Sequence, residues 1–263
     1  MSARAADTEP QLSVRDVAVR FGGILALDGV RFDLHRGQIL GLIGPNGAGK
    51  TTLFNCLSRL YTPASGDIVY EGGSILSSPS HRMPVIGIGR TFQNVSLFRR
   101  LSVRDNIRVG AHSTSASDLF SESLALPWVR RQETRIDLVV AELIDYLDLA
   151  DVADVPVNGL PFGTQKRVEL ARALAIKPGL LLLDEPAGGL NHEEVVELGR
   201  LIRQIRDERG VTVLLVEHHM GLVMSVSDKI VVLNFGRKIA EGAPPEVQSN
   251  PDVVAAYLGG STR

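Results

Sequence analysis

The chain has 263 residues, of which 44% are hydrophobic, and its formal net charge at pH 7 is −2. This length and apolar content suit one compact domain, or a core with a subdomain, and exclude an intrinsically disordered chain. The nearly balanced charge argues against nucleic acid as a partner, because sequence-independent binding usually shows a basic excess or stripe. The one cysteine, Cys56, excludes an intrachain disulfide and favours a reducing compartment.

The N-terminal residues and the apolar runs predict where the chain resides. Residues 1–11 lack the apolar core of a secretion signal and are expected to form a flexible lead. No apolar run approaches the roughly 20 residues of a membrane-spanning helix. The strongest run, residues 180–183, stops at Asp184. We therefore expect a cytosolic chain that does not cross a bilayer.

The first part of the chain predicts several short strands. Residues 12–43 cluster β-branched and apolar residues around turns at Gly22-Gly23 and at residues 35–37. Another strand is expected at residues 67–70. Strands in this part of the chain predict an antiparallel layer beside a parallel core.

Residues 44–52 have the pattern of a phosphate-binding P-loop. They follow the strand-like residues 38–43 and lead into the helix-like residues 53–57, which is the context that this motif requires. The glycines let the main chain wrap closely around phosphates, and the N–H groups at the helix start face that negative charge. The loop therefore predicts a nucleotide site.

Each residue type of the P-loop has a predicted part in binding. Lys50 is expected to reach the β and γ phosphates, and the Thr51 hydroxyl is expected to bind Mg²⁺. A simple glycine-rich turn would explain the glycines but not the lysine and the two threonines after it. The predicted nucleotide-binding residues are Gly44, Pro45, Asn46, Gly47, Ala48, Gly49, Lys50, Thr51 and Thr52.

The middle of the chain changes to a helical pattern. It runs from residue 103 to about residue 172, broken by the serine-rich residues 112–123 and by prolines. Residues 135–147 carry apolar side chains close to an i, i+3, i+4, i+7 stripe, which predicts one packed helical face.

After residue 178, predicted strands and helices alternate. Helices are expected at residues 192–209 and 220–225, and a short closing helix starts at Pro244. The expected strands are residues 180–183, 212–216, 229–234 and 238–241. This alternation implies a parallel sheet with helices on both faces. The predicted buried side of the first helix consists of Val195, Val196, Leu198, Leu201, Ile202 and Ile205.

Two adjacent acids end the apolar strand at residues 180–183. Ligands of open α/β sheets bind beyond the carboxyl ends of the strands, where Asp184 and Glu185 stand. Asp184 would hold the Mg²⁺ shell, and Glu185 would polarise the attacking water as general base. Two acids also end strands at protein surfaces without a catalytic role, but a P-loop in the same chain favours the catalytic interpretation.

The order of these motifs resembles that of the ATP-binding-cassette (ABC) transporter ATPases over residues 12–258, with residues 259–263 as a C-terminal tail. Besides the two phosphate motifs, the resemblance is carried by Phe21, Thr91-Phe92-Gln93, the signature region at residues 160–167, and the histidine after residues 213–217. It implies an α/β fold with a P-loop NTPase core around a parallel sheet. An antiparallel β subdomain and an inserted α-helical subdomain, at about residues 94–172, complete that fold.

The resemblance also implies roles for residues outside the phosphate motifs. Phe21 would stack on adenine, whereas a core phenylalanine is the alternative without the family context. Gln93 would touch both Mg²⁺ and the attacking water. Thr51 and Asp184 would be the other metal-binding residues. His218 follows the strand end directly and would contact the γ-phosphate, whereas His219 is expected to be solvated surface.

The signature region departs from the family pattern Leu-Ser-Gly-Gly-Gln. Residues 160–164 keep only the leucine and Gly163, because Pro161 replaces the serine and Thr164 replaces the glutamine. We therefore expect the contact to a γ-phosphate on the opposite subunit to come from backbone N–H groups around Gly163 and Thr164. Asn191 likewise stands where an aspartate is frequent in the loop that crosses the subunit interface.

Three segments resemble the ATP-binding subunits of branched-chain amino-acid importers: residues 89–98, 217–224 and 250–259. Phe162 and Asn191 also recur in that group. The resemblance implies an ATPase that uses ATP and Mg²⁺ at the cytoplasmic face of the plasma membrane. Its hydrolysis would energise the uptake of branched-chain amino acids or related amides.

The same resemblance implies the partners. They are a second ATPase subunit, identical or paralogous, integral-membrane permeases and, indirectly, a periplasmic or extracellular substrate-binding protein. Two nucleotides would lie between the two ATPase subunits. Two other functions stay open: an ABC ATPase of lipid or lipopolysaccharide export, and a soluble ABC ATPase without a transport role. The second normally carries a long coiled coil or a second cassette, which this sequence lacks.

Overall fold

The computed structural model describes residues 9–91, 96–113 and 127–258, and the side chains of residues 127–130 and 258 are excluded. The chain divides into two compact units. The first consists of Met1–Ser80 with Val196–Arg263, and the second is His81–Val195. Gln93 and the expected N-terminal lead up to residue 8 lie outside the described residues.

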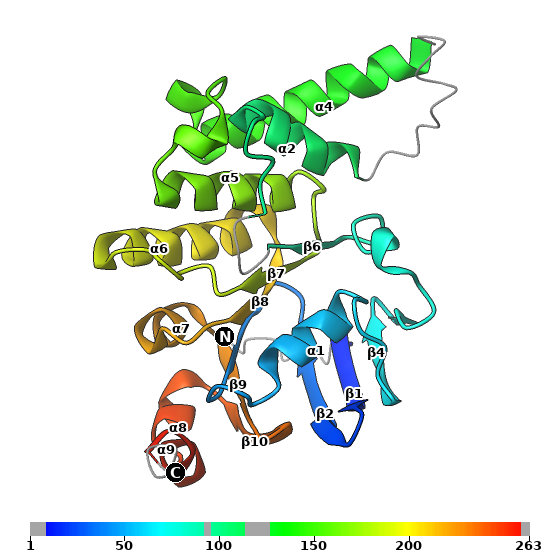
Figure 1. The fold of residues 1–263 in the computed structure, drawn as a ribbon, viewed down its shortest axis with the longest axis vertical. Helices are drawn as coiled ribbons and strands as arrows, with labels where there is room; N and C mark the ends of the chain where they lie inside the picture. Colours follow the sequence, from blue (N-terminus) through cyan, green and yellow to red (C-terminus); the bar gives the residue numbers. More distant parts are fainter. Residues whose placement is uncertain (1–8, 92–95, 114–126, 259–263) are drawn as a thin grey trace, which may run out of the picture. The chain divides into compact units, whose positions relative to one another are not determined.

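The first unit contains the antiparallel layer predicted from the early strands. Strand β1 (Leu12–Phe21) pairs with β2 (Ile24–Leu34) and with β4 (Ser65–Tyr70), and β5 (Gly73–Ser74) pairs with β4. Figure 1 shows β1, β2 and β4 side by side. The turn between β1 and β2 uses Gly22 at a φ of +56°, a left-handed conformation that glycine adopts without a steric penalty.

A parallel group of strands forms the core of the same unit. Strand β3 (Ile39–Ile43) pairs in parallel with β8 (Thr212–Val216) and β9 (Lys229–Asn234), and β10 (Arg237–Gly242) pairs antiparallel with β9. Every residue of β3 and β8 is buried, which explains why their sequences are almost entirely apolar. Because β3 ends at Ile43, the P-loop follows directly from a buried strand.

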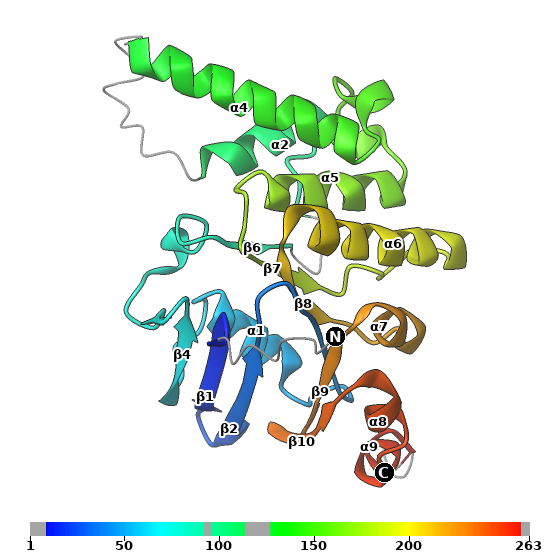
Figure 2. The same cartoon turned by 180° about the vertical axis from the view of Figure 1, so that it is seen from behind.

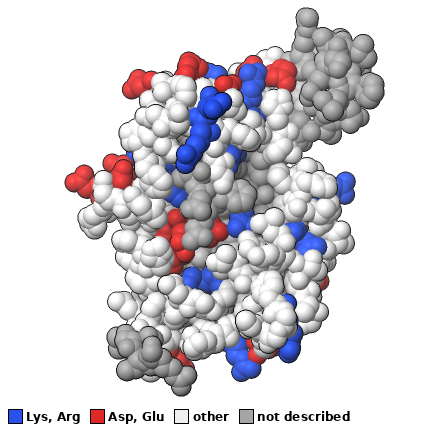
Figure 3. Space-filling model, in the orientation of Figure 1, with Lys and Arg blue, Asp and Glu red and all other residues white. Residues whose placement is uncertain are grey.

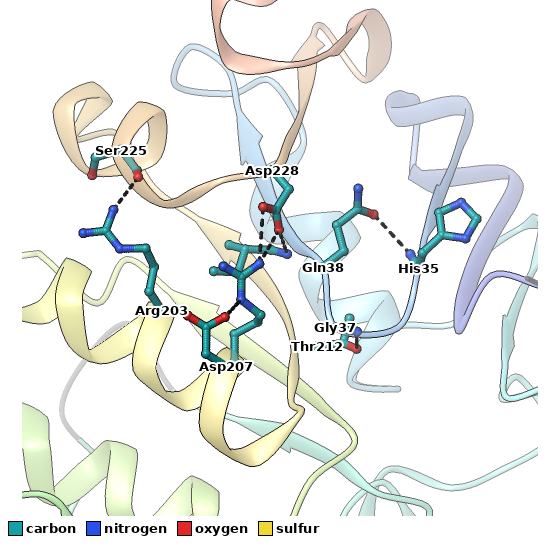
Figure 4. Close-up of polar contacts among 10 residues, drawn as sticks. His35, Gly37, Gln38, Arg203, Asp207, Thr212, Ser225 and Asp228 are labelled. Atoms are coloured by element: carbon teal, nitrogen blue, oxygen red, sulfur yellow. Dashed lines mark hydrogen bonds and ion pairs between the residues drawn. The ribbon is translucent and has the colours of Figure 1, made fainter. Parts of the chain in front are cut away.

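Polar contacts fix the opposite end of β3 (Figure 4). The Asp228 carboxylate accepts a hydrogen bond of 2.8 Å from the Ile39 N–H and another of 3.0 Å from Arg206 Nη1. The Gly37 N–H donates to the hydroxyl of the fully buried Thr212 over 2.8 Å. These contacts anchor the start of the strand whose other end carries the P-loop.

The helices that lie wholly within the described part of the first unit are short. They are α1 (Lys50–Leu57), α7 (Met220–Val226), α8 (Pro244–Gln248) and α9 (Pro251–Leu258). Cys56 is fully buried on α1, and burial raises the pKa of its thiol to about 11, against a small opposing effect of Arg59. The thiol therefore stays protonated at neutral pH and packs as a small hydrophobic group.

The second unit combines two parallel strands with a group of helices. Strand β6 (Ile88–Arg90) pairs with β7 (Leu180–Asp184) in parallel. The helices α2 (Val103–His112), α4 (Pro127–Tyr146) and α5 (Phe162–Leu174) contact one another and lie together in both views of the ribbon (Figures 1 and 2). Single 3₁₀ turns occur at Ser80–Arg82, Ala150–Val152 and Val157–Gly159.

Helix α6 (His192–Arg209) has the predicted bounds, but one side chain of its predicted buried side is exposed. Val195, Ile202 and Ile205 are buried, whereas Val196 is 42% exposed. Successive residues of an α-helix differ by about 100° around the axis, which turns Val196 away from the face that Ile202 and Ile205 share. The inclusion of Val196 in the buried side is therefore wrong.

The structure confirms the predicted fold class, an α/β fold with parallel strands, an antiparallel layer and a helical region. Strand β6 was not predicted, because it has three residues and begins beside glycines. Among the described residues, no helix is both long and apolar enough to span a membrane.

Candidate active site

The P-loop backbone has the conformation that its glycines predict. Gly44, Gly47 and Gly49 have φ angles of +153°, +79° and +101°. A Cβ on Gly44 would lie 2.1 Å from the Leu233 carbonyl oxygen, and one on Gly49 would lie 2.7 Å from the Ala26 carbonyl oxygen. Glycine is therefore required at both positions by its backbone conformation and by the close approach of neighbouring strands.

The Lys50 side chain lies over this loop. It is 8% exposed, and its Nζ donates hydrogen bonds to the carbonyl oxygens of Gly44, at 2.6 Å, and Pro45, at 3.0 Å. The first N–H groups of a helix lack intrahelical acceptors, and α1 begins at Lys50. A buried ammonium and a helix N-terminus at one loop form a site that suits phosphate groups.

Two segments far along the chain hold the P-loop in place. The Gly236 N–H, in the turn between β9 and β10, donates to the Ala48 carbonyl over 3.0 Å. The Tyr257 hydroxyl, on α9, is hydrogen-bonded to the backbone of Gly44, and burial raises the pKa of Tyr257 against that bond. No local sequence pattern connects residue 257 with residue 44, so this role of Tyr257 was not predicted.

Phe21 lies at the surface, so the interpretation as a core phenylalanine is wrong. Its side chain is 46% exposed, and its ring meets that of Tyr61 edge to face, with 5.2 Å between centroids and 74° between planes. Aromatic pairs prefer such a geometry. An exposed aromatic ring at the end of β1 is free to offer a surface to a base, as the stacking prediction requires.

The stacking prediction has a direct test. We expect Phe21→Ala to weaken ATP binding by roughly 5- to 150-fold, because stacking of a base on an aromatic side chain contributes about 1–3 kcal/mol. The affinity for inorganic tripolyphosphate, which has no base, should not change. Calorimetric titration of both ligands measures this difference. Equal losses for the two ligands, or no loss for ATP, would contradict a stacking role.

Asp184 is buried at the end of β7. It contacts Arg90, the last residue of β6, and Thr91, which follows Arg90. Its side chain is 3% exposed, and its Oδ2 accepts from Arg90 Nη2 over 3.1 Å. The Asp184 N–H donates to the Thr91 hydroxyl over 3.3 Å. Burial raises the pKa of Asp184, and the Arg90 guanidinium opposes that shift.

Glu185, the candidate general base, has an unusual backbone conformation. Its φ is +46°, and its carbonyl accepts from the Gly188 N–H over 3.1 Å. A non-glycine residue at positive φ costs free energy, and such strain gathers at functional sites. The turn directs the chain away from β7 immediately after Asp184, and Glu185 is only half-buried there. A half-buried carboxylate beside a buried one fits a base that must reach water.

A buried acid organises the turn that carries His218. Glu217 is fully buried, and its Oε2 accepts from the N–H groups of His218, at 3.1 Å, and His219, at 3.2 Å. The His218 side chain itself is 63% exposed. This role of Glu217 was not predicted, although an acid directly after a buried strand is a signal for it.

His219 is exposed, as expected for solvated surface, but it also has a structural role. Its Nδ1 accepts from the Leu222 N–H over 3.2 Å, so the side chain caps the N-terminus of α7. Capping satisfies one backbone donor that a helix start leaves without an acceptor. Because the His219 side chain caps α7, His218 stays the candidate for the contact with the γ-phosphate.

The signature region forms the start of α5. Its N-cap is Pro161, which provides no side-chain hydrogen bond, and a Cβ on Gly163 would lie 2.6 Å from Glu194 Oε1. Asn191 caps α6: its Oδ1 accepts from the Glu194 N–H over 3.0 Å, and Glu194 Oε2 accepts from the Asn191 N–H over 2.8 Å. Aspartate and asparagine cap helices about equally well, so this reciprocal cap explains why an asparagine can replace the frequent aspartate here.

The oxygen donors of the predicted metal site suit Mg²⁺. The Thr51 hydroxyl and the Asp184 carboxylate are hard oxygen ligands, and Mg²⁺ usually combines one or two such ligands with water and substrate phosphates. No cluster of three or more His, Cys, Asp or Glu side chains exists in the described part of the chain. A hydroxyl and a carboxylate are thus suitable ligands for a metal that binds together with a nucleotide.

Comparison with known proteins identifies the family. Residues 27–188 match the family model described as ABC transporter. The chain belongs to the ABC transporter family. Residues 237–262 match a second model, described as branched-chain amino acid ATP-binding cassette transporter. Both matches confirm the resemblance on which the sequence interpretation relied.

Individual relatives of this ABC subunit cover almost its whole length. The high-affinity branched-chain amino acid transport ATP-binding proteins BraF of Pseudomonas aeruginosa and LivG of Escherichia coli K12 are each 42% identical to it over 252 residues, 96% of this chain and 99% of theirs. A solved structure of the ADP conformation of MJ1267, an ATP-binding cassette of an ABC transporter, has a TM-score of 0.81 and 27% identity. That match covers 96% of this chain and all of MJ1267.

The structure distributes the predicted site residues of this ABC subunit between its two units. The P-loop, Phe21 and His218 belong to the first unit. Asp184, Glu185, Gly163 and Thr164 belong to the second. Besides Glu217 and Tyr257, sequence analysis missed the contact of Arg90 with Asp184, which joins residues 94 positions apart.

Proposed function

We propose that this chain is the ATP-binding and ATP-hydrolysing subunit of an importer for branched-chain amino acids or related amides. The substrate class is supported by sequence identity to two branched-chain amino acid transport ATP-binding proteins. The identity is 42% over almost the full length of both chains. The matched C-terminal segment at residues 237–262 points to the same group.

Nucleotide binding would use groups that the first unit already holds in position. The Lys50 ammonium, now on two loop carbonyls, would transfer hydrogen bonds to the β and γ phosphates. The main-chain N–H groups of residues 44–52 would surround the remaining phosphate oxygens, and Phe21 would stack on the base. Thr51 and Asp184 would hold Mg²⁺, which neutralises phosphate charge when it is bound.

Hydrolysis would depend on Glu185 and His218. A carboxylate that accepts a proton from the attacking water raises the nucleophilicity of that water, and Glu185, next to the proposed metal ligand Asp184, would take this role. The His218 imidazole would contact the γ-phosphate, with its backbone fixed by the buried Glu217. Gln93 would orient the water and touch the metal.

Two subunits, identical or paralogous, would hold two nucleotides between them. Gly163 and Thr164 of one chain would face the γ-phosphate bound by the other, through backbone N–H groups at the start of α5. The γ-phosphate would gain contacts from the second chain only in the closed dimer, so ATP would shift the equilibrium toward closure and hydrolysis would reverse it. The permeases would couple this cycle to alternating access, with the ATPase at the cytoplasmic face of the plasma membrane.

Basic and acidic side chains are interspersed on the face that Figure 3 shows. Figure 3 shows Lys and Arg side chains in small separate groups among acidic and uncharged residues. The described part of this face therefore has no continuous basic stripe.

Reconstitution tests the proposed transport. We expect proteoliposomes with this subunit, its permeases and its binding protein to accumulate radiolabelled leucine, isoleucine, valine or an amide when ATP is supplied. The same complex with the Lys50→Ala subunit should show no ATP-dependent uptake. Lipid extraction without uptake of any amino acid or amide would instead favour the export function. ATP hydrolysis that no permease stimulates would favour a soluble ATPase.

A further inference from the structure

The contact between Arg90 and Asp184 connects the two strands of the second unit. Arg90 is the last residue of β6 and lies opposite Leu182 in the parallel register with β7. Asp184 follows Leu182 by two residues, and side chains two apart on a strand share a face. The guanidinium therefore reaches forward along that face, with 3.1 Å between Arg90 Nη2 and Asp184 Oδ2.

Both charged groups are largely removed from water. The Arg90 side chain is 12% exposed and that of Asp184 is 3% exposed. Burial lowers the pKa of Arg90 and raises the pKa of Asp184, while their attraction opposes both shifts. A buried carboxylate without a partner is costly, so this guanidinium supplies a charge compensation that Asp184 needs.

The same carboxylate is the proposed ligand of Mg²⁺, and a close cation competes with a metal for it. We propose that Arg90 is an internal counter-cation that neutralises and orients Asp184 in the nucleotide-free chain and releases it when Mg²⁺ arrives with ATP. Arg90 is thus a positioning residue that acts through Asp184. This inference rests on the proposed function, in which Asp184 binds the metal.

Backbone contacts allow this exchange without a change in strand pairing. The Thr91 N–H donates to the Leu182 carbonyl over 2.9 Å, and the Thr91 hydroxyl accepts from the Asp184 N–H over 3.3 Å. These bonds hold the ends of β6 and β7 together independently of the Arg90 side chain. A substitution of that side chain should therefore change the charge next to Asp184 and preserve the sheet.

The test compares ATP affinity with and without the metal in the full-length chain. For each variant, the dissociation constant of ATP is measured by calorimetry in EDTA and in excess Mg²⁺, and the ratio of the two constants is the magnesium enhancement. We expect Arg90→Gln to raise this enhancement by about tenfold, or about 1.4 kcal/mol, because the metal no longer displaces a buried cation. The charge-preserving Arg90→Lys should change it by less than about threefold, roughly 0.65 kcal/mol.

Two further variants separate this effect from a loss of stability. Arg104→Gln removes another ion pair of the same unit, 2.8 Å from Asp154 but exposed, and should leave the magnesium enhancement unchanged. In an Asp184→Asn background, Arg90→Gln should have no effect on the enhancement. An unfolding or purely structural defect would instead weaken ATP binding equally in EDTA and in Mg²⁺.

An unchanged or reduced enhancement in Arg90→Gln would overturn the proposal. If that variant does not fold, a crystal structure of the wild-type chain with Mg²⁺ and a non-hydrolysable ATP analogue decides the question. Separation of Arg90 from Asp184 beyond the ion-pair limit of about 4 Å supports the exchange, and a retained contact overturns it. Wild-type protein that binds ATP equally well with and without Mg²⁺ would contradict the metal role in the proposed function itself.

Discussion

Replacing Glu185 by glutamine is expected to reduce ATP turnover by roughly 100- to 10,000-fold, the usual contribution of a positioned general base. The amide has nearly the shape of the carboxylate but accepts no proton at neutral pH. ATP binding should persist, because Lys50 and the P-loop backbone are unchanged. The mutant should therefore accumulate as an ATP-bound dimer that does not reopen.

Two measurements check this result. Phosphate release at saturating MgATP should be lost, and gel filtration with ATP should show a dimer that the wild-type protein forms only transiently. Glu193→Gln, which changes an exposed acid in the first turn of α6, is the matched control and should hydrolyse ATP normally. Turnover at the wild-type rate by Glu185→Gln would show that another group is the base.

Replacing Lys50 by alanine should weaken ATP binding itself, by roughly 30-fold or more, as expected for the loss of one partner of a buried charged pair. Lys50 is 8% exposed and its ammonium already lies at the P-loop, so a phosphate would meet it with little rearrangement. Its removal also deprives the Gly44 and Pro45 carbonyls of a donor. We expect a modest loss of stability of about 1 kcal/mol in the nucleotide-free protein from that change.

Titration calorimetry with ATP and thermal unfolding without nucleotide separate the two effects of Lys50→Ala. Lys238→Ala removes a lysine of the same unit that pairs with Glu241 and should leave ATP affinity unchanged. Wild-type affinity in Lys50→Ala would reject the assignment of this loop as the phosphate site. A drop in stability without a drop in affinity would assign the lysine a structural role only.

Local patterns in the sequence predicted most elements of the fold. Strands β8 and β9 and helix α6 have the predicted bounds, because their apolar runs and helical spacing are properties of neighbouring residues. The P-loop was equally predictable from local sequence. Its glycines are required by local φ angles, and its lysine is required to bind the phosphates that the loop surrounds. The exposed Val196 shows the error of this approach: periodicity predicts which face of a helix is buried but not which residues lie at the border of that face.

Contacts between distant residues were not predictable in this way. Residue 90 meets residue 184 only because β6 and β7 pair in one particular parallel register. Residue 257 meets residue 44 only because α9 packs where β3 ends in the P-loop. Asn191, interpreted from the sequence as a departure from the family pattern, became explicable as a helix cap once Glu194 was seen to complete it.

The sequence by itself identified the family and predicted the nucleotide chemistry and its residues, because phosphate binding requires glycine, lysine and threonine at fixed local spacing. Only the tertiary structure decided which groups compensate the charges of the predicted nucleotide-binding residues before a nucleotide binds. Lys50 is held by loop carbonyls and Asp184 by Arg90. The physical reason is that a buried charge requires a close partner, and the partner is chosen by packing rather than by position in the chain.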